Sequence, residues 1–329
     1  MLFYRRLSCQ HLLRHLGVLA LVIGIWLGSP AATALAAPSV GSSAVTNSPE
    51  QVSIQPYLER TRDRVTRHEL ANGIKFLILQ RDVAPVVSFV TYADVGSVDE
   101  PVGQTGVAHF LEHLAFKGTQ RIGTRDYAQE QGYFEGLDAI FARLKETTDA
   151  EERALLEAEF ARLQAEAASF VEQNEYGQIV ETAGGTGLNA TTSADSTEYF
   201  YSFPANKLEL WMSLESERFL EPVFREFYKE KQVILEERRL RTDNSPIGAM
   251  VEKFLETAFT ASPYGRPIIG YVEDLENIER QDVMRFFDRY YAPSNLTMAV
   301  VGDVDPQEVI RLAESYFGRY PARPAAAPA

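Results

Sequence analysis

The sequence is poor in cysteine, in histidine and in basic residues. Of its 329 residues one is Cys and five are His, and 32 Lys and Arg stand against 46 Asp and Glu, for a formal net charge of −14. A nucleic-acid binder needs a surplus of basic residues to pair with phosphates, so this acidic chain is not expected to bind nucleic acid. With 45% hydrophobic residues, the chain can form one large or two modest domains.

The first 36 residues have the pattern of a secretory signal peptide. Three arginines precede an apolar run over residues 16–27, and Ala34-Leu35-Ala36 forms a small-residue cleavage site. We therefore predict cleavage after Ala36 and export to the periplasm or the extracellular space. An uncleaved membrane anchor is the alternative, but the run is shorter than the roughly 20 residues of a spanning helix, so no stable membrane span is expected.

Cleavage would leave a chain without cysteine, because Cys9 lies in the removed segment. An exported chain without disulfides must be stabilised by its core or by a metal. We predict a flexible leader over 37–57 and a linker-like tail over 321–329, because both contain runs of small residues and proline. The folded domain is then expected over 58–320.

Between these ends, β-rich and helical segments alternate. Strands are expected at 65–70 and 74–80, joined by a tight turn at Asn72-Gly73, and at 86–95, 188–203 and 296–301. Helices are expected at 106–116 with Thr105 as N-cap, and at 208–218, 224–241, 247–259, 280–290 and 306–316. This order predicts an α+β fold, a mostly antiparallel sheet with helices packed on one face.

Residues 126–178 interrupt this pattern. Apolar residues recur there at helical spacing on both sides of a break at Thr147-Thr148-Asp149. We predict a helical hairpin inserted into the domain. It could be a solvated pair that only lengthens the fold, or a gate or a contact for a partner.

The residues suited to chemistry are concentrated in His109-Phe110-Leu111-Glu112-His113. Residues four apart on a helix face the same way, so both histidine rings can bind one zinc ion. Zinc lowers the pKa of its bound water, and Glu112 is placed to accept the proton as a general base. Two surface histidines at this spacing by chance are the alternative, which the scarcity of histidine disfavours.

A third ligand is expected from the predicted helix at 224–241. Glu230 and Glu237 are seven residues apart and share one face, whereas Glu236 points about 100° away from it. We predict Glu237 as the ligand and Glu230 as the residue that orients a histidine ring or holds water. An acidic helix face is usually solvated, so periodicity alone does not select the ligand.

The stretch from Gly106 to Thr119, with its His-x-x-Glu-His order, resembles the pitrilysin/insulysin family of metallopeptidases, which includes the mitochondrial processing peptidases. The resemblance continues through 188–200, 230–237, 262–270 and 291–296, and spans about 64–320. It implies a pitrilysin-like catalytic half with one zinc ion per chain.

The resemblance also implies roles for single residues. His109, His113 and Glu237 would bind the zinc, with Glu112 as the general base on zinc-bound water and Glu230 as an accessory acid. Asn189 and Ala190 would lie on an edge strand that pairs with the substrate backbone. From the residues alone, Asn189 would be interpreted as a strand-end or turn residue.

Peptidases of this family enclose the substrate between two similar halves, and the second half supplies an Arg and a Tyr. This chain resembles the first half only, with the insertion widening the separation of His113 from Glu237. The expected function is a zinc metalloendopeptidase that hydrolyses peptides or small unfolded proteins, completed by a C-terminal-half-like partner subunit or by a missing second domain. A non-catalytic assembly subunit is the alternative, but the complete set of catalytic residues favours the enzyme.

Overall fold

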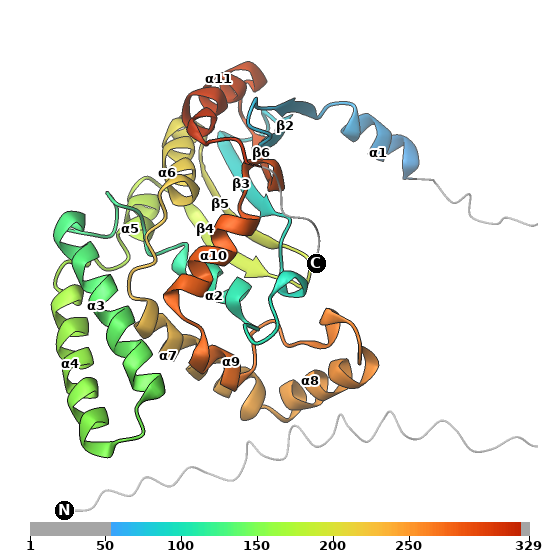
Figure 1. Cartoon of the computed structure of the whole chain (residues 1–329). Coiled ribbons are helices and arrows are strands. Elements are labelled where there is room, and N and C mark those ends of the chain that lie inside the picture. Colours follow the sequence, from blue (N-terminus) through green and yellow to red (C-terminus); the bar gives the residue numbers. More distant parts are fainter. Residues whose placement is uncertain (1–53, 324–329) are drawn as a thin grey trace, which may run out of the picture. The chain divides into compact units, whose positions relative to one another are not determined.

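A computed structural model of the chain describes residues 54–323. Within this range six strands form one sheet in the order β1-β2-β6-β3-β5-β4 (Figure 1). The strands are β1 (Thr66–Glu69), β2 (Lys75–Gln80), β3 (Val86–Ala93), β4 (Thr186–Thr192), β5 (Thr197–Pro204) and β6 (Leu296–Gly302). Neighbouring strands are antiparallel except β2 and β6, which are parallel. The sheet is therefore mostly antiparallel, as predicted.

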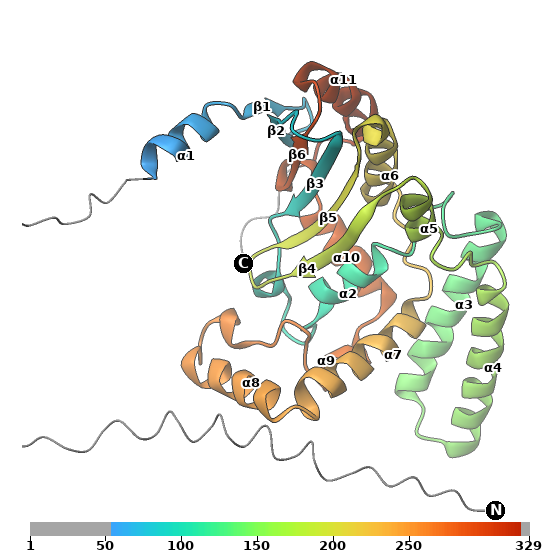
Figure 2. The same ribbon diagram turned by 180° about the vertical axis from the view of Figure 1, so that it is seen from behind.

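Helices cover one face of this sheet. Side chains of β5 and β6 alternate between buried and half-buried positions, as expected when only one face is covered. The buried face packs against α6 (Leu208–Leu220), α10 (Arg280–Tyr290) and α11 (Pro306–Tyr316), with the ring of Phe89 stacked on that of Trp211 at 4.3 Å. Seen from behind, β3, β4 and β5 lie in front of α6 and α10 (Figure 2). The predicted α+β class is confirmed.

Apart from the inserted hairpin, the other α-helices are α1 (Gln55–Arg62), α2 (Val107–Leu114), α5 (Glu175–Thr182), α7 (Phe227–Arg238), α8 (Pro246–Ala258) and α9 (Val272–Asn277). In Figure 1 they lie below the sheet, as α2, α7, α8 and α9 do, or to its sides, as α1 and α5 do. The sequence did not predict α1, α5 or α9. Helix α1 begins inside the segment 37–57 predicted as a flexible leader, with Pro56 in its first turn.

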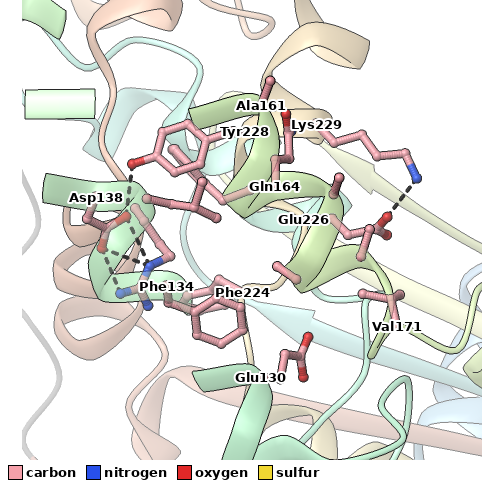
Figure 3. A pocket seen from close by; sticks show the side chains of 16 residues that line it. Glu130, Phe134, Asp138, Ala161, Gln164, Val171, Phe224, Glu226, Tyr228 and Lys229 are labelled. Carbon is pink, nitrogen blue, oxygen red and sulfur yellow. Dashed lines mark hydrogen bonds and ion pairs between the residues drawn. The ribbon is translucent and has the colours of Figure 1, made fainter. Parts of the chain in front are cut away.

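The inserted hairpin consists of α3 (Tyr127–Glu146) and α4 (Ala150–Ala168). The predicted break is correct, since the Asp149 carboxylate accepts the N–H groups of Glu151 and Glu152 and caps α4. The hairpin packs against α7 and α10 around a cavity of about 410 Å³ (Figure 3). At one side of this cavity Asp138 accepts hydrogen bonds from Tyr228 at 2.9 Å and from Arg280 at 2.7 Å. The hairpin is thus fastened to the domain and is not surrounded by solvent alone.

One predicted strand is wrong. The segment 188–203 forms two strands, β4 and β5, that pair as a hairpin. The turn between them arises from local serine chemistry, because the Ser193 hydroxyl accepts the N–H groups of Asp195 and Ser196. Because the residues on both sides of this turn favour β-strands, the sequence pattern predicted one continuous strand.

Several sequence predictions fall on residues that the structure does not describe. The signal peptide over 1–36, the leader up to residue 53 and the last residues of the tail lie outside the described residues. Between residues 54 and 323, no helix is both long and apolar enough to cross a membrane.

Candidate metal and catalytic site

Helix α2 carries the two clustered histidines on one face. The His109 and His113 rings are 4.7 Å apart, centroid to centroid, at an angle of 79°. The residues around them, Phe110, Leu111 and Leu114, are buried in the core and fix the orientation of the helix. The four-residue spacing therefore brings both imidazoles to one place, as predicted.

The N-terminus of α2 is capped from outside the helix. The prediction that Thr105 is the N-cap is wrong, because Gly106 takes this position with φ of 90°. The buried Glu100 carboxylate instead accepts the N–H groups of Gly106 at 2.9 Å and Ala108 at 3.0 Å. The Thr105 hydroxyl donates to Asp274 at 2.6 Å. Gly106 is required here since a Cβ would lie 2.6 Å from the carbonyl oxygen of Ile269.

Helix α7 brings two glutamates to these histidines. Glu237 Oε2 lies 3.4 Å from His113 Nε2 and 3.9 Å from His109 Nε2. Two turns earlier on the same face of the helix, Glu230 Oε2 lies 3.3 Å from His113 Nδ1. Glu236 points away and pairs with Arg239 at 2.7 Å. The seven-residue spacing thus places Glu230 and Glu237, but not Glu236, at the histidines.

The donor set fits a zinc ion. One ligand atom each from His109, His113 and Glu237 lies within 4.8 Å of the other two. Tetrahedral zinc with bonds of about 2.1 Å requires ligand atoms roughly 3.4 Å apart, close to the two distances that Glu237 makes with the histidines. Two imidazole nitrogens and one carboxylate oxygen are also ligands that zinc prefers, and three protein ligands leave one position open.

The two histidines differ in protonation. Burial and the neighbouring His113 lower the pKa of His109 to about 4, so its ring is neutral. Burial also acts to lower the pKa of His113, but hydrogen bonds to Glu230 and Glu237 outweigh it and raise the value to about 9. In the metal-free protein at neutral pH, His113 is therefore an imidazolium ion held between two carboxylates.

Glu112 lies beside the histidines on the wall of an open cavity of about 1000 Å³. Burial raises the pKa of its carboxyl, and a hydrogen bond opposes this rise. The donor is the Thr192 hydroxyl of β4, 2.5 Å from Glu112 Oε2. A half-buried carboxylate with a raised pKa suits a general base.

Asn189 and Ala190 lie on β4, at the edge of the sheet, and line the same cavity. The Asn189 side chain contacts the backbone of its own strand, where its Oδ1 accepts the Ala190 N–H at 2.9 Å. An edge strand exposes backbone groups that can pair with another chain. In this structure the backbone N–H of Ala190 already donates a hydrogen bond to the side chain of Asn189.

Sequence reasoning missed three residues that hold the site together. Glu100 caps α2, Thr192 contacts Glu112, and Lys117 binds Glu230 at 2.5 Å. Thr192 and Lys117 lie within the segments 188–200 and 106–119 that carry the family resemblance. Their spacing in the sequence does not predict which residues they contact. Glu100 reaches the helix from a preceding turn, which no helix-capping pattern covers.

Two family models match the chain. Residues 76–156 and 160–271 match the family described as Insulinase (Peptidase family M16), and residues 277–329 match the Peptidase M16 inactive domain. The first match covers more than half of the chain and contains all of the residues that approach the histidines.

Similar proteins include zinc proteases and a processing peptidase. The chain is 31% identical over 257 residues to the zinc protease PqqE of Helicobacter pylori, covering 76% of this chain and 47% of that protein. It is 25% identical over 253 residues to the probable mitochondrial-processing peptidase subunit beta of Schizosaccharomyces pombe, covering 76% of this chain and 44% of that protein. The chain thus spans about half the length of these relatives.

Solved structures share the fold. A protease from Helicobacter pylori superposes with a TM-score of 0.63 at 28% identity, covering 80% of this chain and 53% of that chain. The periplasmic protease PqqL from Escherichia coli superposes with a TM-score of 0.61 at 22% identity, covering 80% of this chain and 25% of that chain. A peptidase M16 inactive domain from Pseudomonas fluorescens also superposes, with a TM-score of 0.57 at 17% identity, covering 80% of this chain and 52% of that chain.

Proposed function

Because the chain belongs to the insulinase family of peptidases, we propose that it is the catalytic half of a zinc-dependent endopeptidase that hydrolyses peptides or small unfolded proteins. One observation carries this proposal. The ligand atoms of His109, His113 and Glu237 converge, and Glu112 lies on the wall of the same cavity.

In this proposal His109, His113 and Glu237 hold one zinc ion. When bound, zinc polarises the scissile carbonyl and lowers the pKa of water. Glu112 accepts a proton from the attacking water and then donates it to the leaving amine. Its position is held by Thr192, so the carboxylate stays directed into the cavity.

Glu230 acts through His113. Its carboxylate accepts a hydrogen bond from His113 Nδ1 at 3.3 Å, which leaves Nε2 directed towards Glu237 at 3.4 Å. Lys117 binds the other oxygen of Glu230 at 2.5 Å. Glu230 is thus a positioning residue that fixes the tautomer of a ligand.

The free edge of β4 would align the substrate. An extended peptide can add to this edge by backbone hydrogen bonds, with the Ala190 N–H as one donor. The substrate carbonyl would then displace Asn189 Oδ1 from the Ala190 N–H. Asn189 keeps this donor satisfied until a peptide arrives.

A second half is part of the proposed enzyme. The chain covers about half of its relatives, and its fold also superposes on an inactive domain of the family. We propose that a homologous partner chain, or a second domain of a longer protein, closes the cavity over the bound peptide. A purely structural subunit is the alternative, but such a role needs neither the three converging ligands nor Glu112.

We further propose that the protein is exported and acts in the periplasm or outside the cell. The signal-peptide pattern over residues 1–36 supports this. One structural neighbour, PqqL, is described as periplasmic.

The test is zinc binding and peptide cleavage by the purified chain. We expect one zinc per chain by elemental analysis, and cleavage of a peptide library that a chelator abolishes. Cleavage should increase if a homologous second half is added.

Glu112→Gln is the matched control, since it keeps the shape and the zinc ligands but cannot accept a proton. It should retain zinc and lose at least about 100-fold in turnover. Absence of zinc from the native chain, or undiminished cleavage by Glu112→Gln, would refute the proposed function.

A further inference from the structure

The cavity between the inserted hairpin and α7 is separate from the candidate catalytic cavity (Figure 3). Its volume of about 410 Å³ lies within the roughly 300–1000 Å³ of small-molecule sites. Within residues 54–323, none lines both this cavity and the one that contains His109 and Glu112. Side chains inside proteins normally fill such a space, so its presence between packed helices points to an occupant.

Small side chains of α4 leave this space open. Ala161, Ala165 and Ala168 line the cavity, and their spacing of four and three residues places them on one side of the helix. Their side chains end at Cβ and therefore do not fill the space in front of the opposite wall. All three are exposed, so solvent reaches this wall and a ligand can enter beside it.

The opposite wall consists of large apolar side chains that are held in the core. Phe227 and Tyr228 of α7 are 2% and 8% exposed. The Phe227 ring stacks on that of Phe110 at 4.7 Å, and the Tyr228 ring packs against that of Phe160 at 5.0 Å. Further apolar side chains line the cavity: Phe134, Leu137, Val171 and Phe224. The wall is therefore formed in advance, and an apolar molecule placed against it would be removed from water.

Every charged side chain that lines the cavity is already paired with an opposite charge. Asp138 binds Arg280 at 2.7 Å at one end, and Glu226 binds Lys229 at 2.6 Å at the other (Figure 3). The fifth charged residue, Glu130, makes a buried ion pair at 2.9 Å. A charged ligand would lose hydration in this cavity without gaining a free partner. The cavity therefore favours an uncharged occupant.

Gln164 supplies a polar group that is not already engaged. It lies on α4, lines the cavity and is half-buried. Its side-chain amide makes no hydrogen bond to any side chain or backbone group between residues 54 and 323. An amide offers one acceptor and a donor group, so a single hydroxyl, carbonyl or amine of a ligand can pair with it.

We propose that this cavity binds one uncharged, largely apolar small molecule that carries a single hydrogen-bonding group for Gln164. A protein segment fits less well, because its backbone N–H and C=O groups would need many partners in the cavity. The proposed site goes beyond the peptidase function and does not depend on it.

The test uses two fluorescent probes that differ in charge. N-phenylnaphthylamine is uncharged, carries one N–H and fluoresces in apolar surroundings, whereas anilinonaphthalene sulfonate adds a negative charge to the same rings. We expect the purified chain to bind one molecule of the uncharged probe with a Kd on the order of 10–100 µM. The sulfonate should bind at least about 10-fold more weakly. No binding of the uncharged probe, or equal or tighter binding of the sulfonate, would overturn the site.

Variants on α4 locate the probe. Ala161→Leu and Ala165→Leu place a larger side chain in the cavity, and each should weaken binding of the uncharged probe at least about 10-fold. Ala158→Leu is the matched control, because Ala158 is exposed on the same helix but does not line the cavity. Gln164→Leu should weaken binding about 3- to 10-fold through the loss of one hydrogen bond. Binding that neither Ala161→Leu nor Ala165→Leu weakens would contradict the proposal.

Two further measurements exclude other occupants. Val251 lines the catalytic cavity and is 46% exposed. If Val251→Asn removes the probe fluorescence and Ala165→Leu does not, the probe binds in the catalytic cavity and the proposed site is wrong. Sedimentation velocity tests whether a second copy of the chain covers the cavity. A dimer that Ala165→Leu dissociates, and that the uncharged probe leaves intact, would also overturn the site.

Discussion

Replacing Arg225 with methionine should weaken the connection between the loop after α2 and the start of α3. Arg225 is 1% exposed, and its guanidinium donates to both oxygens of the fully buried Glu130, at 2.9 and 3.2 Å. It also donates to the carbonyl oxygens of Lys117 at 2.5 Å, Thr119 at 2.7 Å and Ile122 at 2.9 Å. Every N–H of the guanidinium therefore has an acceptor.

The size of the effect follows from these contacts. Removing one partner of a buried ion pair costs about 3–5 kcal/mol, because the other charge remains buried without compensation. Three carbonyl oxygens would also lose a donor, so we expect Arg225→Met to lower the free energy of unfolding by about 5 kcal/mol. That is a large fraction of the roughly 5–15 kcal/mol that stabilises a typical domain.

The assay is urea unfolding followed by circular dichroism, with zinc removed so that metal binding does not contribute. In the double variant Arg225→Met with Glu130→Gln, the uncompensated charge is gone, and about 2 kcal/mol of stability should return. Arg121→Met is a control in the same loop, since the Arg121 side chain is 68% exposed, and it should change stability by less than about 1 kcal/mol. A loss below about 1 kcal/mol for Arg225→Met, or a double variant no more stable than it, would refute this reasoning.

Three other perturbations test the site. Zinc binding near pH 7 should release about one proton from His113, because the pKa of this residue in the metal-free protein is about 9. The affinity for zinc should therefore rise about tenfold per pH unit up to pH 9. Calorimetry in buffers of different ionisation enthalpy measures the number of protons released. Thr192→Val removes the hydrogen bond that opposes the raised pKa of Glu112, so the acid limb of the kcat/KM profile should move to higher pH, and an unchanged limb would contradict this role. Glu100→Ala leaves two N–H groups of α2 without acceptors and should lower the free energy of unfolding by about 2–4 kcal/mol, with weaker zinc binding as a second readout.

The parts of the site that lie on single helices could be predicted from the sequence. His109 and His113 are four residues apart, and Glu230 and Glu237 seven apart, so helical geometry alone brings each pair to one face. The helices at 280–290 and 306–316 likewise have the bounds that their periodicity predicts. In each case the information is contained within a few turns of the chain.

Contacts between distant segments could not be predicted in this way. Glu100 reaches α2 only because the turn after β3 brings it back to the helix, and Thr192 meets Glu112 only because β4 is packed beside α2. The break at Ser193–Ser196 depends on a hydroxyl accepting nearby N–H groups, which competes with strand propensity within a β-rich stretch. Tertiary packing determines the contacts of Glu100 and Thr192, and local side-chain hydrogen bonds determine the turn at Ser193–Ser196.

The place of β6 in the sheet governs how the domain can assemble. The β1-β2 hairpin, at residues 66–80, joins the rest of the sheet only through β6, at residues 296–302, which lies between β2 and β3. In a nascent chain that ends before β6, the central position of the sheet is empty, and the edges of β2 and β3 that would pair with β6 are unpaired. Contacts between such remote segments slow folding, so the domain should close only after nearly its whole length has been synthesised. Truncation before residue 296 should leave a chain that aggregates through these unpaired edges.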